Sequence, residues 1–280
     1  MALTVNTNLF SLNAQRNLQK SQSDLGTSLQ RLSTGLRINS AKDDAAGLFV
    51  AEKVTADIRG LNQSVRNAAD GISLGQTAEG SLGQISQSLQ RIREIAVQSA
   101  NATVQDRTGL QKEVDQLTQE ISRIVQTTEF NGTSLLSGTT SLVFQVGQDG
   151  TATNQISIST ANLASSTTVV AYNSSLTATG TVDVSSQATA SAALTSLDTS
   201  IDTISQNRAT FGAVQNRFEA VISNLQNYSE NLSATRSRIQ DADFAQETAN
   251  LTRAQILQQA GVSILAQANT QPQAALSLLQ

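Results

Sequence analysis

The chain has 280 residues and a net charge of −4, and its 39% apolar content includes only 3% aromatic residues. It contains no His and no Cys, which removes the commonest transition-metal ligands, the thiol nucleophile and the usual near-neutral base, so we expect no enzyme activity and no cofactor. The 18 basic and 22 acidic residues form no basic excess, and no run of 18 apolar residues occurs, so we expect neither nucleic acid nor a membrane as a partner.

The first segment of the chain is uncharged yet rich in apolar residues. Residues 1–15 carry no charged side chain. The leucines that follow are spaced by seven, four or three residues, which predicts a helix that packs against a partner. The apolar positions are Leu3, Val5, Leu9, Phe10 and Leu12, then Leu18, Leu25, Leu29, Leu32 and Leu36.

The next segment has the heptad spacing of coiled-coil helices. Ser40 followed by Asp43 resembles a capping box and predicts a new helix near Ala41. Breaks are expected at Asp70-Gly71 and between residues 101 and 109. Two apolar series step by three and four residues, Ala78, Leu82, Ile85, Leu89, Ile92 and Ala96, then Leu110, Val114, Leu117, Ile121 and Ile124.

The middle of the chain lacks Lys and Arg over residues 124–207 and carries turn signals such as Asn131-Gly132. Residues 142–146 and 155–158, on either side of Asp149-Gly150, predict a β-hairpin. Residues 169–172 and 181–184 fit further short strands, but a flexible Ser/Thr linker over 160–195 fits the composition equally well.

The C-terminal flank repeats the heptad pattern. Its apolar positions alternate steps of three and four residues: Phe211, Val214, Phe218, Val221, Leu225, Tyr228, Leu232, Thr235 and Ile239. One apolar stripe does not stabilise an isolated helix, so this flank needs the matching stripes of the N-terminal flank. We therefore predict a mainly α fold: a discontinuous, coiled-coil-like helical rod built from N- and C-terminal segments, with a small central insertion that contains the β-hairpin.

The last segment resembles the first, because residues 254–280 also lack any charged side chain. Its apolar residues include Leu251, Ile256, Leu257, Val262, Ile264, Leu265, Leu276, Leu278 and Leu279. Uncharged, apolar ends suit surfaces that become buried on self-association. The alternative is that the two ends simply pair as an ordinary terminal helical hairpin.

Several long motifs resemble those of bacterial flagellins. Residues 30–47 (QRLSTGLRINSAKDDAAG), 90–101 (QRIREIAVQSAN) and 130–132 (FNG) match the N-terminal signature. Residues 238–245 (RIQDADFA), with QQA at 258–260 and LAQAN at 265–269, match the C-terminal one. The resemblance covers about 1–147 and 200–280, and the remaining stretch fits the variable insertion of that family.

The resemblance implies a self-assembling structural subunit of the flagellar filament that serves swimming motility. It implies type III export of the unfolded chain, an extracellular location, and as partners other copies of the chain, an export chaperone, the filament cap, hook-associated proteins and host innate immune receptors. The implied domains are 1–40 plus 240–280 as terminal assembly helices of the inner tube, 41–140 plus 200–239 as the rod, and 141–199 as an exposed insertion. The terminal assembly positions are Leu3, Leu9, Leu12, Leu257, Ile264 and Leu265.

The resemblance also assigns surface sites. Arg91, Ile95 and Glu113 match a patch that contacts neighbouring subunits and the vertebrate innate receptor, and we expect them beside the apolar seams rather than on them. Residues of the segment 30–51 resemble an epitope sensed by a plant receptor kinase: Gln30, Arg31, Leu32, Ser33, Gly35, Leu36, Arg37, Asn39, Ser40, Lys42, Asp43 and Asp44. Ser and Thr clusters at 165–168, 174–177 and 185–200 are candidate O-glycosylation sites.

Two other functions fit the sequence. A flagellin-like hook–filament junction protein would share the terminal motifs without polymerising. A secreted coiled-coil adhesin would act as a monomer with stably folded ends. Long filaments grown from the purified chain would distinguish the filament subunit from both.

Overall fold

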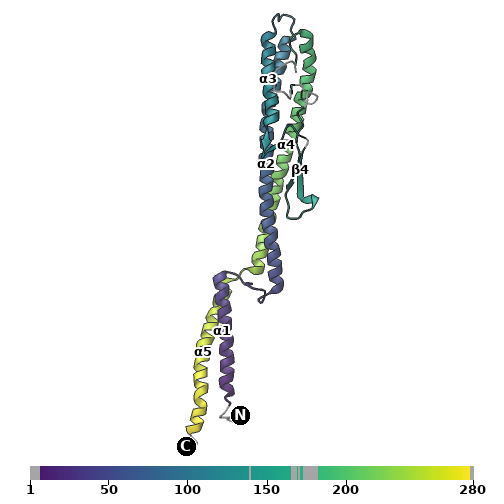
Figure 1. Cartoon of the computed structure of the whole chain (residues 1–280). Coiled ribbons are helices and arrows are strands. Elements are labelled where there is room, and N and C mark those ends of the chain that lie inside the picture. Colours follow the sequence, from purple (N-terminus) through teal and green to yellow (C-terminus); the bar gives the residue numbers. More distant parts are fainter. Residues whose placement is uncertain (1–6, 139, 165–168, 170, 173–181, 278–280) are drawn as a thin grey trace. The chain divides into compact units, whose positions relative to one another are not determined.

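The computed structural model describes residues 7–138, 140–164, 169, 171–172 and 182–277. Most of these residues are helical (Figure 1). The helices are α1 (Leu9–Thr34), α2 (Ala45–Ser99), α3 (Thr108–Thr127), α4 (Gln187–Gln240) and α5 (Phe244–Ser277). The strands are β1 (Glu129–Phe130), β2 (Thr133–Ser134), β3 (Ser141–Gln145) and β4 (Gln155–Ser159). The predicted mainly α fold with a small β-hairpin insertion is confirmed.

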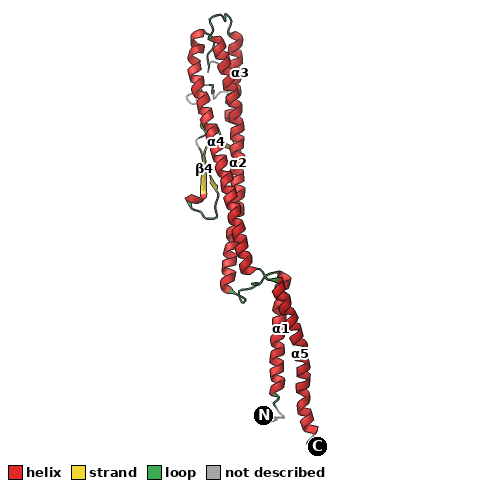
Figure 2. Ribbon diagram, turned by 180° about the vertical axis from the view of Figure 1, so that it is seen from behind, coloured by secondary structure: helices red, strands yellow, loops and turns green. Residues whose placement is uncertain are grey.

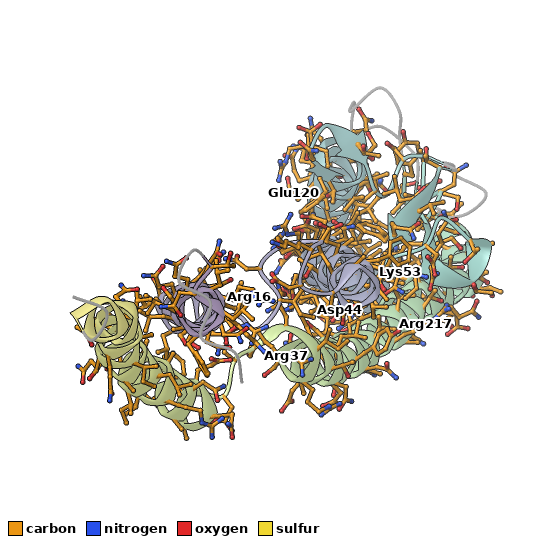
Figure 3. The ribbon with its side chains drawn as sticks, turned by 90° about the horizontal axis from the view of Figure 1, so that it is seen from below. Arg16, Arg37, Asp44, Lys53, Glu120 and Arg217 are labelled. Carbon is orange, nitrogen blue, oxygen red and sulfur yellow. The ribbon has the colours of Figure 1, made fainter. Side chains whose placement is uncertain are left out.

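The chain forms two compact units, each with its own contacts. One unit contains residues 1–58 and 230–280, and the other contains residues 59–229. In the first unit the two ends of the sequence meet, because α1 and α5 lie side by side (Figure 2). In the second unit α2, α3 and α4 lie side by side, and exposed charged residues such as Glu120 of α3 and Arg217 of α4 are labelled in Figure 3.

The core of the second unit follows the heptad positions. The residues of the apolar series that are buried are Ala78, Leu82, Ile85, Leu89, Ile92, Ala96, Val114, Ile121, Phe211, Phe218 and Leu225. Those that are half-buried are Leu110, Leu117, Ile124, Val214 and Val221, and in the first unit Leu232, Thr235 and Ile239. Tyr228, expected in the same series, is 43% exposed. The helical stripe of α4 thus turns away from the core near this residue.

The helix α2 runs without a break through Asp70-Gly71, where the sequence predicted an interruption. Gly71 has a packing role instead, because a Cβ atom added there would lie 2.6 Å from Cζ of Phe218. The Phe218 ring lies edge-on to Phe144 of β3, with the ring centroids 5.6 Å apart. The glycine therefore makes room for an aromatic pair that holds α4 and the β-hairpin against α2.

The start of α2 also differs from the prediction. Asp44 is the N-terminal cap, since its Oδ1 accepts a 2.9 Å hydrogen bond from the backbone N–H of Gly47. Asp43 closes the preceding turn by accepting from the backbone N–H of Ser40 at 2.9 Å. The predicted capping box was therefore one turn early, and the helix begins at Ala45 rather than near Ala41.

The break between α2 and α3 falls where it was predicted. Arg107 stabilises this connection by donating hydrogen bonds to the carbonyl oxygens of Ser99 and Asn101, at 2.9 and 3.0 Å. A cation at the carboxyl end of α2 complements the helix dipole.

The predicted hairpin is confirmed as β3 paired antiparallel with β4, with Leu142 opposite Ile158 and Phe144 opposite Ile156. A smaller hairpin, β1–β2, turns at Asn131 and Gly132, whose φ angles of 49° and 76° suit a two-residue turn. Both hairpins belong to the second unit.

The connection into α4 settles part of the ambiguity over residues 160–195. The described residues of 169–172 and 181–184 form no strand, but Val182 and Val184 are buried. The side chain of Gln111 donates to the carbonyl oxygen of Val182 and accepts from the N–H of Val184, at 3.0 and 2.7 Å. The helix α4 then begins at Gln187, ahead of residue 200 where the rod was expected to resume.

Replacing Gly71 by Ala should destabilise the second unit by about 1–3 kcal/mol, because the new methyl group overlaps the Phe218 ring. Gly83 of the same helix has no neighbour within 4 Å of an added Cβ, so Gly83→Ala should instead stabilise by about 0.5–1 kcal/mol. Urea denaturation followed by circular dichroism measures both free energies of unfolding. Equal effects of the two substitutions would contradict the packing role of Gly71.

Candidate assembly interface

The helices α1 and α5 form an antiparallel pair within the first unit (Figures 1 and 2). At one end of the pair, the hydroxyl of Ser11 donates to Oδ1 of Asn269 at 2.9 Å, and Nδ2 of Asn8 donates to the carbonyl oxygen of Ala268 at 2.7 Å. At the other end, Arg31 pairs with Glu247 at 2.9 Å. Polar contacts therefore hold both ends of the pair.

The face along which the two helices meet is built mainly from small residues. The small buried residues of α1 are Ser11, Ala14, Ser21 and Ser28, and those of α5 are Ala254 and Ala268. At Gly261 of α5 an added Cβ would lie 3.4 Å from Cδ1 of Leu18. Small side chains let two helices approach closely, but they bury little apolar area between them.

Many large apolar side chains of both helices remain exposed. The exposed ones are Leu9, Phe10, Leu12, Leu29, Phe244, Ile256, Leu257, Val262 and Ile264. Leu18, Leu25, Leu32, Leu251 and Leu265 are half-buried. Leu9 is 62% exposed and Ile264 is 58% exposed, so the pair leaves more apolar surface in contact with solvent than an ordinary helical hairpin does. The prediction that Leu29 belongs to the seam of α1 is wrong, because Ser28 occupies the contact instead.

The remaining terminal assembly residues have mixed positions. Leu265 is half-buried against the pair. Leu3 lies outside the described residues, as do the Ser and Thr clusters at 165–168 and 174–177 that were singled out for glycosylation. The outward apolar surface is thus defined by the exposed residues of α1 and α5 named above, and we call it the outer face of the terminal pair.

The ion pair between Arg31 and Glu247 is the charged contact of the terminal pair. Glu247 is only 6% exposed. Burial raises the pKa of its carboxyl group, but the Arg31 guanidinium and the polar side chains of Ser28 and Asn250 beside it outweigh burial and hold the pKa below its ordinary value. Arg31 lies in the last turn of α1 and Glu247 in the first turn of α5, so each charge also complements its helix dipole.

The segment between α1 and α2 is tied to the start of α5. Gly35 ends α1 with a φ of 72°, a left-handed conformation that suits glycine. Leu36 forms an isolated antiparallel bridge with Asp241. Arg37, labelled in Figure 3, donates to the carbonyl oxygen of Ile239 at 2.6 Å.

The epitope-like residues therefore divide between a helix and a loop. Gln30, Arg31, Leu32 and Ser33 lie on α1, and Gly35, Leu36, Arg37, Asn39, Ser40, Lys42, Asp43 and Asp44 lie in the loop that follows. Most of the loop is exposed, including Asp43. Backbone and side-chain hydrogen bonds from Ser40, with a further backbone one from Asn39, lower the pKa of its carboxyl group.

The patch predicted on the second unit is only partly a surface. The Arg91 guanidinium lies 2.8 Å from the Glu113 carboxylate and 3.1 Å from that of Glu94, and both ion pairs are exposed. Ile95, however, is 1% exposed, so its predicted position beside the seam is wrong. The helix α2 packs against both α3 and α4, which widens its buried stripe beyond the two heptad positions read from the sequence.

The sequence reasoning missed the small-residue contact and the buried ion pair. The sequence does contain a pattern that indicates the small-residue contact, because Ala14, Ser21 and Ser28 are seven residues apart, as are Ala254, Gly261 and Ala268. The predicted seam residues Leu18, Leu25 and Leu32 are half-buried and alternate along α1 with Ala14, Ser21 and Ser28, so the prediction found the leucines of this face and missed the small residues between them.

Two features are absent from the described part of the chain. No group of three or more His, Cys, Asp or Glu side chains gathers there to hold a metal ion. Of the helices described, none is long and apolar enough to cross a bilayer.

Comparison with known proteins identifies relatives of the whole chain. Residues 5–141 match the family described as the bacterial flagellin N-terminal helical region, and residues 194–279 match the bacterial flagellin C-terminal helical region. A flagellin of Halalkalibacterium halodurans is 44% identical, covering 99% of this chain and 100% of the relative. A flagellin of Bacillus subtilis is 41% identical, with the same two coverages of 99% and 100%.

A solved structure is similar in fold. It is described as that of a putative flagellar hook-associated protein from Vibrio parahaemolyticus, and it matches with a TM-score of 0.60 at 16% identity, covering 71% of this chain and 100% of that one. At this identity the likeness concerns the fold alone.

The terminal pair should weaken in acid. Because the folded-state pKa of Glu247 lies below its ordinary value of 4.5, its ionised form contributes stability above that value, and this contribution is lost as the pH falls through the lowered folded-state pKa. Helix content and the unfolding temperature, followed by circular dichroism between pH 6 and pH 3, should decline less steeply in Glu247→Gln than in the wild type. Parallel declines in the two proteins would contradict this assignment.

Proposed function

Because the chain belongs to the bacterial flagellin family and is a structural subunit of the flagellar filament, we propose that it polymerises through the outer face of the terminal pair. The observation that carries this proposal is the exposed apolar surface of α1 and α5. Small residues make up much of their mutual contact, and many large apolar side chains of the two helices remain exposed.

The energetics favour covering this face with other copies of the chain. Fully burying one Leu, Ile, Val or Phe side chain is worth roughly 1.5–3 kcal/mol, and the outer face exposes several of them on each helix. Residues 1–15 and 254–280 carry no charge, so their burial between subunits leaves no ion without a partner. This combination suits an interface that forms on assembly.

The same reasoning suggests an order of layers. We assign residues 1–40 with 240–280 to the inner tube, residues 41–140 with 200–239 to the rod, and residues 141–199 to an outward-facing insertion. The uncharged, apolar ends support the first assignment, and the Ser- and Thr-rich composition of the middle supports the last.

Further partners follow from filament assembly outside the cell. We propose export of the unfolded chain through the flagellar type III channel, with an export chaperone, the filament cap and hook-associated proteins as partners. The absence of Cys and the single Pro of the sequence are compatible with such transit, because slow disulfide and prolyl steps are absent or few.

The exposed cluster of Arg91, Glu94 and Glu113 is a candidate contact for neighbouring subunits and for host innate receptors. A pre-positioned guanidinium between two carboxylates offers a charged anchor of the kind enriched in interface hot spots. Buried Ile95 would act by supporting α2 rather than by touching a receptor.

A charge placed on the outer face should block polymerisation. Ile264→Glu would bury an unpaired carboxylate between subunits, so the critical concentration should rise at least tenfold while the helix content of the monomer is unchanged. Val143→Glu is the matched control, since Val143 of β3 is 57% exposed, close to the 58% of Ile264. Negative-stain microscopy and sedimentation measure the outcome.

Long filaments from the wild type and from Val143→Glu are expected, which also separates a filament subunit from a hook–filament junction protein. Normal filaments from Ile264→Glu would contradict the proposed interface.

Removing the guanidinium of Arg91 should weaken recognition by the innate receptor. Arg91→Ala removes a hot-spot type of contact, and we expect the monomer concentration for half-maximal receptor signalling to rise about tenfold. Arg123→Ala is the control, because Arg123 forms a similar exposed ion pair with Glu120 on α3. Equal responses to the two variants in a receptor-reporter cell assay would count against this patch.

A further inference from the structure

We propose that the ion pair between Arg31 and Glu247 sets the register in which α1 pairs with α5. Register here means which residue of α1 lies opposite which residue of α5 along the antiparallel pair. The inference builds on the proposed function only in its consequence for assembly, and it can be tested separately from it.

The small-residue contact specifies register poorly. Ala14, Ser21 and Ser28 repeat every seven residues on α1, and Ala254, Gly261 and Ala268 repeat every seven residues on α5. A slip of one heptad, about 10 Å along the helices, would again place small residues opposite small residues. Packing of the small residues alone therefore leaves slipped pairings close in energy to the observed one. The hydrogen bonds of Asn8 with Ala268 and of Ser11 with Asn269 would also be broken by a slip, but they involve only neutral groups.

The charged residues of the two helices remove this ambiguity. Arg31 lies opposite Glu247, and Asp24 and Arg253 line the same cleft between the helices. Along this cleft each helix therefore offers one positive and one negative charge in complementary order. The observed register joins Arg31 to Glu247 in an ion pair.

Each one-heptad slip would bring like charges together. A slip in one direction moves Glu247 from Arg31 to the position of Asp24, seven residues earlier. A slip in the other direction moves Arg31 to the position of Ala254, next to Arg253. In the first slip the carboxylate of Glu247, which is 6% exposed in the observed register, would also remain between the helices without its counterion.

The bond between Arg31 and Glu247 is better placed for this role than the exposed ion pairs of the second unit. Arg208 and Glu79 join α4 to α2 at the same distance of 2.9 Å, but their side chains are 43% and 42% exposed. Solvent screens such a pair, so its rearrangement carries little penalty. Buried polar or charged groups are the type of residue that fixes register in helical pairs.

The backbone bridge near the loop does not replace the ion pair. Leu36 and Asp241 pair through main-chain groups, which any residue offers and which neighbouring positions can supply equally well. The charge of a side chain, in contrast, depends on the residue at each position. The charged side chains therefore distinguish one register from another, which the main-chain bridge does not.

Gly261 and Leu18 provide a direct reporter of register. A Cβ atom at position 261 would lie 3.8 Å from Cβ of Leu18, which is close to the usual separation in a disulfide. The chain has no native Cys, so Leu18→Cys with Gly261→Cys would report the observed register. Leu25→Cys with Gly261→Cys would report the register slipped by one heptad.

The experiment uses the full-length chain carrying each cysteine pair, equilibrated in a glutathione redox buffer. The intrachain disulfide is quantified by non-reducing gel mobility and peptide mass spectrometry. With the native ion pair, the effective concentration for the 18–261 disulfide should exceed that for 25–261 at least tenfold. In Glu247→Gln the preference should fall below threefold, with helix content unchanged.

Two further variants complete the test. Reversal of all four charges, Arg31→Glu and Glu247→Arg with Asp24→Lys and Arg253→Glu, should restore at least a tenfold preference, because each slip then again brings like charges together, and the control Glu79→Gln should leave the original preference intact. The proposal is overturned if Glu247→Gln keeps the tenfold preference, if the reversal fails to restore it, or if Glu247→Gln loses helix content together with the preference. It is equally overturned if the chain with the native ion pair shows no preference at all.

The consequence for assembly follows from geometry. A slip of one heptad would displace the exposed apolar residues of α5 by about 10 Å relative to those of α1, and so would change which of them lie side by side on the outer face. Failure of the wild-type chain to polymerise would count against the proposed function, whereas the disulfide preference is read from single chains and tests the register alone.

Discussion

The contact between α1 and α5 is the constraint on which the rest depends. Its small side chains, among them Ala14, Ser21 and Ala254, bring the helices together but bury little apolar area. Many large apolar side chains of the same helices are exposed, so that water would contact them in a single chain. We propose that other subunits cover these side chains in the filament, which would couple the folding of the chain ends to polymerisation.

The second unit, in contrast, buries most of its large apolar side chains. Leucine, isoleucine and valine fill the interior between α2, α3 and α4, and the Phe218 ring sits over Gly71 and against Phe144. This unit carries its own core and does not require a partner to bury its large side chains. The two kinds of packing give one chain both a stable scaffold and a surface reserved for assembly.

Much of the fold could be predicted from the sequence, because heptad spacing and turn residues are strong local signals. The β3–β4 hairpin and the break before α3 were found in this way. Ile95 was misjudged because a helix with two neighbours buries more than two heptad positions. Gly71 looked like a break because only the folded chain brings Phe218 against it. The contact of the terminal pair was only partly predicted, because the apolar pattern marked Leu18, Leu25 and Leu32 but not the small residues that alternate with them.

The central claim is that subunits bury the outer face of the terminal pair when the filament forms. The most direct measurement is maleimide labelling of single cysteines in monomers and in filaments, with Val262→Cys on the outer face and Val143→Cys on the hairpin, at residues 54% and 57% exposed. We predict that polymerisation slows labelling at position 262 at least tenfold and leaves position 143 reactive. Equally rapid labelling of position 262 in filaments and monomers would contradict the account.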